Sequence, residues 1–182
     1  MEIPTVESSM LVLIDLQQKL VPAMAEPENT VGKSALLLRG AGELGLDVLV
    51  SEQYPQGLGN TVPLISTWLP DTAPVVAKKS FSVFGEPELV KVINAKKRKT
   101  LIFAGVETHV CVLQSVLDAI AAGYEVIVVS DAVCSRKIAD RDAALAVMRQ
   151  AGAWVLTVET VLFMLLRSAG NPAFKSISKL VK

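Results

Sequence analysis

The sequence predicts an α/β fold, namely a three-layer α/β/α sandwich built on a six-stranded, mainly parallel sheet. Its apolar runs are nearly continuous and alternate with helical patterns, as expected of strands that are covered on both faces. At Gly45, Gly123 and Gly152 a glycine follows a helical stretch and precedes an apolar run. Glycine in that position typically ends a helix, so we expect a helix-to-strand junction at each of these places.

The length and composition of the chain indicate one domain. The chain has 182 residues, of which 51% are hydrophobic, and this is enough for one well-filled core. Two separate cores would each be small at this length. We therefore treat residues 1–182 as a single domain.

Six apolar runs are the expected strands. In chain order they are residues 10–14, 46–50, 74–77, 101–104, 124–129 and 153–156. Helical patterns occupy most connections, and the last of them covers residues 159–169. The connection 51–73 has no clean period and is rich in proline and glycine, which predicts a long ordered loop with a helical turn near residues 62–68. The expected strand order is 3-2-1-4-5-6, as in doubly wound folds.

Composition argues against several classes of function. Lys and Arg number 18, as do Asp and Glu, and the longest basic run is 96–99, so a nucleic-acid partner is weakly supported. Residues 1–9 lack the basic flank and apolar stretch of a signal peptide, and no apolar run approaches the roughly 20 residues that span a bilayer. Cys111 and Cys134 fit reduced thiols better than a disulfide. We expect a cytoplasmic protein that binds neither nucleic acid nor membranes.

Polar residues that could carry chemistry follow three of the expected strands. Asp15 ends the first strand, Lys78 and Lys79 follow the third, and Cys111 comes shortly after the fourth. In doubly wound sheets, ligands bind beyond the carboxyl ends of the strands, where the strand order reverses. In the expected order this reversal lies between the first and fourth strands, which puts Asp15 and Cys111 side by side.

Cys111 is the candidate nucleophile. It lies at the start of a helical pattern, where the helix dipole favours negative charge, so we expect a lowered thiol pKa and a reactive thiolate. Asp15 could act as general base and Lys78 could hold both negative charges while Cys111 attacks a carbonyl group. Cys134 has no partner motif nearby, and we interpret it as structural.

Each of the three candidates also has an ordinary explanation. Asp15 could cap a helix that begins at Leu16, the lysines could be solvated, and Cys111 could be a small buried hydrophobe. Their shared position at one edge of the sheet favours the catalytic interpretation.

Three segments carry a resemblance to a known family. Residues 13–17 (Leu-Ile-Asp-Leu-Gln), 78–82 (Lys-Lys-Ser-Phe-Ser) and 105–112 (Gly-Val-Glu-Thr-His-Val-Cys-Val) resemble the signature blocks of the isochorismatase-like cysteine hydrolases. That superfamily includes isochorismatases, nicotinamidases and N-carbamoylsarcosine amidases. The similarity extends over nearly the whole chain. Residues 52–59, 171–175 and 177–182 are most similar to the isochorismatase domain-containing subgroup, whose substrates are poorly defined.

The resemblance implies a catalytic triad of Asp15, Lys78 and Cys111. Lys78 is preferred to Lys79 because the family's lysine is followed, three residues later, by an aromatic residue and then a serine. In this chain the pair Phe81-Ser82 has that spacing only from Lys78.

The resemblance also implies an unusual backbone just before the nucleophile. It places a cis peptide bond between Val106 and Glu107. It further implies that the backbone N–H groups of Glu107 and Cys111 point at an oxyanion, as an oxyanion hole does.

The chain departs from the metal-dependent nicotinamidases of the same superfamily. Those enzymes bind a metal through an Asp and histidines after the second strand, but residues 51–55 contain no histidine here, and His109 is the only one in the chain. A single imidazole cannot furnish such a site, because borderline metals usually need several nitrogen or sulfur ligands. We therefore expect neither a metal nor another cofactor.

Five side chains at the same sheet edge are candidates for substrate binding. They are Gln53, Tyr54, Phe81, Phe84 and His109. Aromatic residues in such positions also serve as packing, and His109 could equally be a polar or capping residue of the first helical turn.

The predicted function is a cysteine-dependent hydrolase that cleaves a C–N bond of a small amide or related carbonyl compound through a thioester. Two alternatives stay open. One is a non-catalytic binding or scaffold protein on the same fold. The other is a hydrolase for vinyl ethers such as isochorismate, driven by Asp15 without the thiol. The resemblance further implies a homo-oligomer.

Overall fold

Six parallel strands form the sheet at the centre of the molecule, in the order β3-β2-β1-β4-β5-β6. They are β1 (Ser9–Ile14), β2 (Asp47–Gln53), β3 (Val75–Lys78), β4 (Thr100–Val106), β5 (Glu125–Cys134) and β6 (Trp154–Leu156). This computed structural model describes residues 2–182 and confirms the predicted fold and strand order. All residues of β1 and β4 are buried, because helices cover both faces there, and this explains their unbroken apolar runs.

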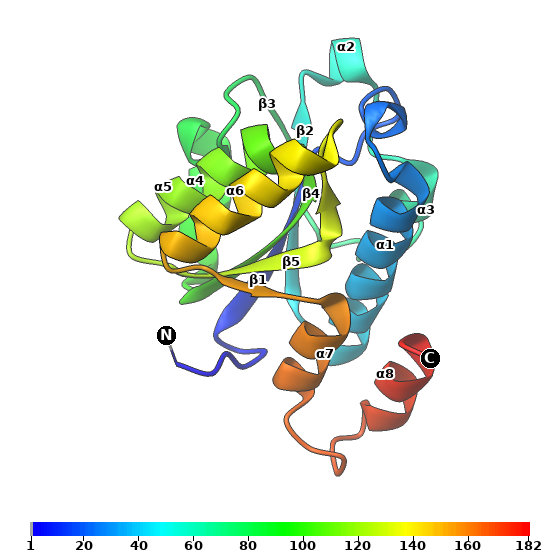
Figure 1. Cartoon of the computed structure of the whole chain (residues 1–182). Helices are drawn as coiled ribbons and strands as arrows, with labels where there is room; N and C mark the ends of the chain where they lie inside the picture. The colour runs from blue at the N-terminus through cyan, green and yellow to red at the C-terminus, as the bar shows by residue number, and fades with distance from the viewer. Residues whose placement is uncertain (1) are drawn as a thin grey trace.

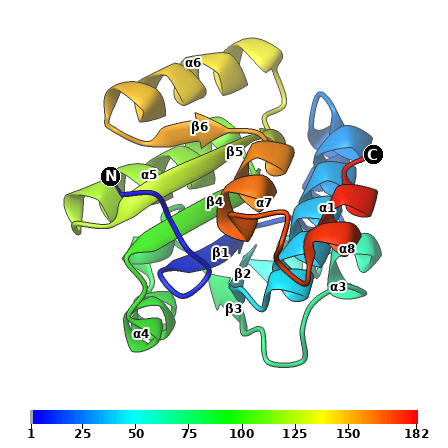
Figure 2. The same cartoon turned by 90° about the horizontal axis from the view of Figure 1, so that it is seen from below.

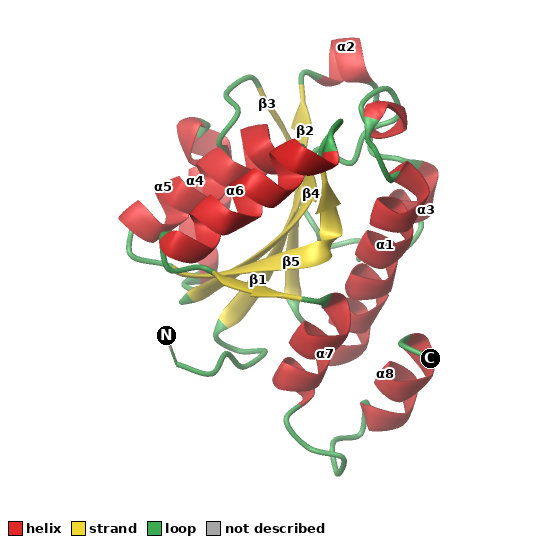
Figure 3. Cartoon of the chain, viewed as in Figure 1, coloured by secondary structure: helices red, strands yellow, loops and turns green. Residues whose placement is uncertain are grey.

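Two layers of helices cover the sheet (Figures 1, 2 and 3). One face carries α1 (Pro27–Leu44), α7 (Val158–Leu166) and α8 (Phe174–Leu180). The other face carries α4 (Pro87–Lys96), α5 (Leu113–Ala121) and α6 (Ile138–Gln150). Short helical turns make up the rest: η1 (Val21–Ala23), α2 (Pro55–Leu58), α3 (Pro63–Ser66), η2 (Val83–Gly85) and η3 (Thr108–Val112).

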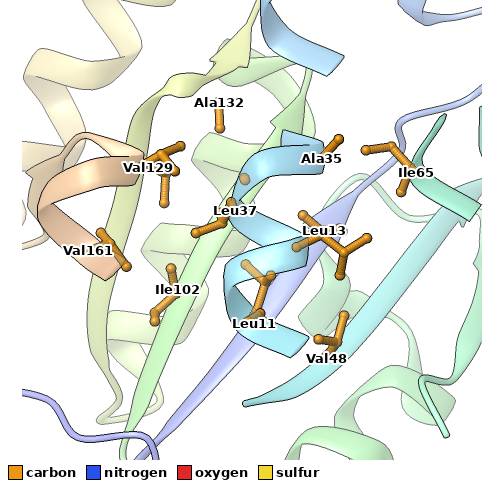
Figure 4. Packing of buried hydrophobic residues seen from close by; sticks show 14 of the residues in the cluster. Leu11, Leu13, Ala35, Leu37, Val48, Ile65, Ile102, Val129, Ala132 and Val161 are labelled. Atoms are coloured by element: carbon orange, nitrogen blue, oxygen red, sulfur yellow. The ribbon is translucent and has the colours of Figure 1, made fainter. Parts of the chain in front are cut away.

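Each face of the sheet has its own apolar cluster. Figure 4 shows the one beneath α1 and α7, where Leu37 and Val161 pack over Leu11, Ile102 and Val129 of the sheet. Alternate residues of a strand point to opposite faces, so the neighbouring strand residues fill the second cluster beneath α4, α5 and α6. Both faces of the sheet are thus covered by packed apolar side chains.

Several elements differ from the sequence prediction, among them β2, which runs three residues further than expected, to Gln53. β5 continues five residues beyond the expected end, to Cys134, because a register shift opposite Phe103 and Gly105 lets it resume pairing with β4. α7 ends at Leu166 instead of residue 169, since Arg167 has a positive φ of 65°. The connection after β2 contains two helical turns, α2 and α3, where one was expected.

Among residues 2–182, every helix is too short or too polar to span a bilayer.

Candidate active site

Asp15 and Lys78 form a fully buried ion pair at the carboxyl edge of the sheet, the edge nearest α2 in Figure 1. Nζ of Lys78 lies 2.7 Å from Oδ2 of Asp15, and both side chains are 0% exposed. Asp15 directly follows β1 and Lys78 ends β3, while β2 lies between these two strands. The ion pair therefore bridges two strands across the end of the one that separates them.

The backbone of Asp15 leaves the strand in a left-handed conformation, with φ of 52°. Aspartate is one of the residues that tolerate this conformation. The next helical turn starts only at Val21, and the carbonyl oxygen of Asp15 accepts a hydrogen bond from the N–H of Gln17 at 2.8 Å. The alternative that Asp15 caps a helix beginning at Leu16 is therefore wrong. A glycine is needed opposite, at Gly105 with φ of 117°, because a Cβ there would collide with the backbone of Ile14.

The ammonium group of Lys78 is surrounded by oxygen atoms. Besides Asp15, it donates to Oε1 of Gln53 at 2.7 Å and to the carbonyl oxygens of Phe81 at 2.9 Å and Ser80 at 3.2 Å. Lys78 is thus buried and hydrogen-bonded, whereas the neighbouring Lys79 is exposed. Of the two lysines, only Lys78 belongs to the cluster, and the alternative that it is a solvated residue is wrong.

Cys111 lies in η3, the π-helical turn that joins β4 to α5, and is 5% exposed. Burial raises the pKa of the Cys111 thiol to about 12; the negative charge of Asp15 adds to this increase and the positive charge of Lys78 opposes it. The expectation of a lowered thiol pKa is therefore wrong. The helix dipole contributes at most about 2 kcal/mol, and removal of a thiolate from water beside a carboxylate outweighs it.

Asp15 is correspondingly a stronger base than a free carboxylate. Burial raises the pKa of its carboxyl group, and this outweighs the opposing effects of Lys78, of the hydrogen bond from Ser51 and of the Cys111 thiol. The mutual influence of Asp15, Lys78 and Cys111 means that the three side chains gather at one point of the sheet edge. The thiol therefore keeps its proton at neutral pH, beside a carboxyl group whose pKa is raised.

The peptide bond between Val106 and Glu107, just before η3, is cis. Within residues 2–182 the N–H of Glu107 has no hydrogen-bond acceptor, while its carboxylate pairs with Nε of Arg136 at 2.8 Å. The carbonyl oxygen of Cys111 accepts from Oγ of Ser115 at 2.6 Å, which in turn accepts from the N–H of Val83 at 3.0 Å. Ser115 thus connects the turn that carries Cys111 to η2.

Gln53, the last residue of β2, and Tyr54, which follows it, have different surroundings. Gln53 contacts Lys78, so its side chain belongs to the ion-pair network. Tyr54 is 51% exposed and lines a shallow open pocket of about 230 Å³ together with Lys79 and Glu86. Ala77 and Lys78 at the end of β3 line the same pocket.

The remaining three candidates differ in what they contact. Phe81 is 52% exposed, and its ring is free to meet a ligand. The ring of Phe84 packs against Tyr124, with 5.8 Å between ring centroids, so it serves the core beneath α5. Nδ1 of His109 lies 2.9 Å from Oγ of Ser135, which holds the imidazole at the end of β5.

Two buried residues of the network were not predicted from the sequence. Oγ of Ser51 donates to Oδ1 of Asp15 at 2.7 Å. Oε1 of Gln17 accepts from the N–H of Gln53 at 2.7 Å, and its Nε2 donates to the carbonyl oxygen of Gln53 at 3.0 Å. The available signal was spacing, because Ser51 and Gln53 stand two residues apart and so share one face of a strand.

Cys134 is fully buried within the core at the end of β5, as a structural residue would be. No three His, Cys, Asp or Glu side chains within the described part of the chain lie close enough together to hold a metal ion.

Comparison with known proteins agrees with this architecture. The family model for the isochorismatase domain matches residues 9–160. Isochorismatase domain-containing protein 2A of Mus musculus is 40% identical over 177 residues, covering 97% of this chain and 84% of that protein. The chain therefore spans most of the length of this relative.

Two solved structures share the fold closely. The MAR1 ribonuclease from Caenorhabditis elegans has a TM-score of 0.93 and 36% sequence identity, covering 98% of this chain and 91% of that one. The YcaC gene product from Escherichia coli, described as an octameric hydrolase of unknown specificity, has a TM-score of 0.92 and 29% identity, covering 97% and 88%. Together with the match of the family model over most of the chain, these similarities show that the protein belongs to the isochorismatase family.

Proposed function

We propose that this protein is a cysteine-dependent hydrolase that cleaves a C–N bond of a small amide or related carbonyl compound through a thioester on Cys111. The observation that carries the proposal is the buried cluster in which a thiol lies beside a carboxylate of raised pKa that is paired with Lys78. Nucleophile, base and orienting charge are the parts that covalent acyl transfer needs.

In the first half of the reaction, Sγ of Cys111 attacks the carbonyl carbon while its proton passes to Asp15. The resulting tetrahedral intermediate carries one negative charge on oxygen, which the N–H groups of Glu107 and Cys111 receive. Each such donor contributes about 3 kcal/mol to transition-state stabilisation. Asp15 then gives the proton to the departing nitrogen, the C–N bond breaks, and a thioester remains.

In the second half, water attacks the thioester carbonyl carbon and gives its proton to Asp15. The C–S bond breaks, the carboxylic acid leaves, and the proton returns to the sulfur. Lys78 stays charged throughout and stabilises the ionised form of Asp15. The raised pKa of the Cys111 thiol fits this scheme, because the proton has to leave only during the attack and the base beside it is stronger than usual.

The buried ion pair favours an enzyme over a scaffold protein. Taking Asp15 and Lys78 out of water costs several kcal/mol per ion, and their attraction does no more than offset that cost. A binding protein gains nothing from this arrangement, whereas an active site uses it. Since the thiol pKa is raised, slow alkylation of Cys111 does not indicate a scaffold, and turnover is the measurement that separates the two.

The test compares the two buried cysteines. A panel of small amides is offered to the wild type, to Cys111→Ala and to the matched control Cys134→Ala. We expect Cys111→Ala to lose activity by about a thousandfold or more and the control to retain it within about twofold. An acid quench during turnover should add the mass of the acyl group to the peptide that contains Cys111. Undiminished turnover in Cys111→Ala would exclude the covalent mechanism.

The raised pKa of Asp15 favours one second candidate, hydrolysis of a vinyl ether. A carboxyl group that keeps its proton to higher pH can protonate the double bond, and this step needs no thiol. With isochorismate as substrate, this candidate predicts that Cys111→Ala retains activity and that Asp15→Asn loses it. The amide hydrolase requires that both variants be inactive.

The proposed partners are a small-molecule substrate in the cytoplasm and further copies of this chain. The octameric neighbour supports a homo-oligomer, which sedimentation velocity would detect. RNA is not proposed, although the Caenorhabditis elegans neighbour is named a ribonuclease. Basic and acidic residues balance at 18 each, and the cation at the centre of the site is 0% exposed. A single-stranded RNA in the substrate panel tests this directly. If the wild type cleaves the RNA and Cys111→Ala does not, RNA would replace small amides as the substrate class.

A further inference from the structure

We infer that Gln53 is a positioning residue that holds the ammonium group of Lys78, and that its neutral amide leaves Asp15 as the sole counter-ion of Lys78 among residues 2–182. This inference rests on the proposed function, in which Lys78 supports the charge of Asp15 during proton transfer. It changes the role expected from the sequence, where Gln53 was a candidate for binding the substrate.

Gln53 and Asp15 lie at the same distance from the ammonium group of Lys78. Oε1 of Gln53 and Oδ2 of Asp15 each lie 2.7 Å from Nζ, closer than the carbonyl oxygens of Phe81 at 2.9 Å and Ser80 at 3.2 Å. An ammonium group has three N–H donors. Four acceptors surround these donors and fix the position of the ammonium group, and Gln53 makes one of the two shortest contacts.

The amide of Gln53 is itself oriented by further hydrogen bonds. Its Nε2 donates to the carbonyl oxygen of Lys79 at 2.9 Å, so the amide oxygen must face Lys78. Its backbone N–H and carbonyl group are both bound by the side chain of the buried Gln17, at 2.7 and 3.0 Å. Gln17 also donates to the carbonyl oxygen of Gly59 at 2.6 Å. The position of Gln53 is thus set at both its backbone and its side chain.

Strand order explains why β2 supplies this residue. β2 lies between β1, which leads to Asp15, and β3, which ends at Lys78. Ser51 and Gln53 point to the same face of β2, and each contacts one member of the ion pair. Side chains of β2, the middle strand, therefore hydrogen-bond to both charged groups. Cys111 comes from η3, which follows β4 on the other side of β1.

The charged groups around this cluster leave Gln53 as the position where one added charge acts most strongly. Asp15, Lys78 and Cys111 come from β1, β3 and η3, respectively. On β2, Glu52 faces the other way, and its carboxylate accepts from the N–H and Oγ1 of Thr61 at 2.6 and 2.8 Å. The charged groups of the neighbouring segments lie outside the cluster: Lys79, Glu86, and the pair of Glu107 with Arg136. His109 is held by Ser135.

The experiment adds a carboxylate at this position and at a matched one nearby. Gln53→Glu places a second acid beside Lys78, whereas Gln56→Glu makes the same change three residues away on an exposed side chain. Gln53→Met keeps the length of the side chain and removes the acceptor without adding charge. Alkylation of Cys111 by iodoacetamide at pH 9, followed by mass spectrometry of its peptide, reports the thiol without the need for a substrate.

In Gln53→Glu we expect alkylation about threefold slower than in Gln56→Glu. An added negative charge raises the thiol pKa by about one unit, and the greater nucleophilicity of the thiolate offsets part of the loss. For any amide that is turned over, the acid limb of kcat/KM should move up by about one pH unit in Gln53→Glu and stay in place in Gln56→Glu. In Gln53→Met, kcat should fall about tenfold with KM unchanged within about twofold.

Three outcomes would overturn the inference. Equal alkylation rates in the two Glu variants would mean that Gln53 does not act on the charged cluster. Faster alkylation in Gln53→Glu would mean that the amide only keeps the site closed. A raised KM with an unmoved pH profile would assign Gln53 to the substrate. Failure of the wild type to hydrolyse any amide would refute the proposed function instead, and the alkylation comparison would still decide the role of Gln53.

Discussion

Aspartate ion pairs of nearly the same length lie beside the two ends of β2, in opposite surroundings. At its first residue, Asp47 is 2.6 Å from Nζ of Lys96 and 2.7 Å from a guanidinium nitrogen of Arg98, and all three side chains are partly exposed. Beyond its last residue, Asp15 is 2.7 Å from Lys78, and both are fully buried. In both carboxyl groups, burial acts to raise the pKa. At Asp47 the hydrogen bonds and charges of Lys96 and Arg98 outweigh that effect, so the pKa is lowered. At Asp15 burial dominates, so the pKa is raised.

The comparison teaches that distance does not separate a structural ion pair from a functional one. The exposed cluster makes its carboxylate a weaker base and contributes little to stability, because solvent screens it. At the buried pair, burial makes the carboxylate a stronger base in spite of Lys78, and removal of both charges from water costs stability. Strongly perturbed groups gather at functional sites for this reason, and here the perturbed one lies beside a thiol.

The largest expected effect is on turnover after Asp15→Asn. Asparagine keeps the size of the side chain but cannot accept the thiol proton, so kcat/KM should fall about a thousandfold, within the range that general bases contribute. Asp47→Asn removes the same charge at the other end of the strand and should change kcat/KM by less than about twofold. Steady-state kinetics on one hydrolysed amide measures both. Similar losses of kcat/KM in the two variants would contradict a specific role of Asp15, because removal of either aspartate charge would then disturb the site.

Removal of the cation should destabilise the buried pair far more than the exposed one. Lys78→Met leaves the Asp15 carboxylate buried without its counter-ion, and we expect a loss of about 3 to 5 kcal/mol in the free energy of unfolding at pH 7. Lys96→Met leaves Asp47 with Arg98 and solvent, and should cost less than about 1 kcal/mol. Urea denaturation with unchanged m-values measures the difference. A loss below about 1 kcal/mol in Lys78→Met would contradict a buried charge at Asp15.

The pKa shifts predict opposite pH dependences for the two aspartates. A raised pKa means that folded Asp15 binds more protons than unfolded Asp15, so its contribution to the free energy of unfolding falls as the pH rises from about 4 through the raised pKa. A lowered pKa means that the contribution of Asp47 is present above about 4 and is lost as the pH falls through the lowered pKa. Unfolding of Asp15→Asn and Asp47→Asn relative to the wild type across pH 3 to 7 should show slopes of opposite sign.

The same shifts bear on activity. Turnover should be lost as the pH falls through the raised pKa of Asp15, above the ordinary carboxyl range near 4. It should show no rise near pH 8.5, where a free cysteine ionises, because the pKa of the Cys111 thiol is about 12. A thiolate limb near pH 8 in the profile of kcat/KM would contradict the raised thiol pKa.

The sequence predicted the sheet edge well because strand ends are local features. Asp15 and Cys111 could be placed side by side from apolar runs and strand order alone. The choice of Lys78 over Lys79 needed the family resemblance, because the two lysines are adjacent and only side-chain direction separates them. Ser51 and Gln17 escaped prediction, since their roles depend on which atoms face each other across three strands.

The thiol pKa was predicted in the wrong direction for a related reason. The helix dipole can be inferred from a segment, but burial and the charge of Asp15 come from residues distant in the sequence. Both of these oppose ionisation of Cys111, and together they outweigh the dipole. Local patterns therefore indicated where the site lies and left its electrostatics undetermined.

The smallest expected effect concerns salt. In Asp47→Asn the loss in the free energy of unfolding should be below about 1 kcal/mol at 0.05 M NaCl and shrink further at 1 M, where the Debye length is only about 3 Å. The loss in Lys78→Met should change little over the same range, because ions do not enter a fully buried pair. Urea denaturation of both variants at the two salt concentrations makes the comparison. A salt-insensitive loss in Asp47→Asn would show that the exposed cluster is shielded from solvent, and the contrast between the two ends of β2 would then rest on the neighbouring thiol alone.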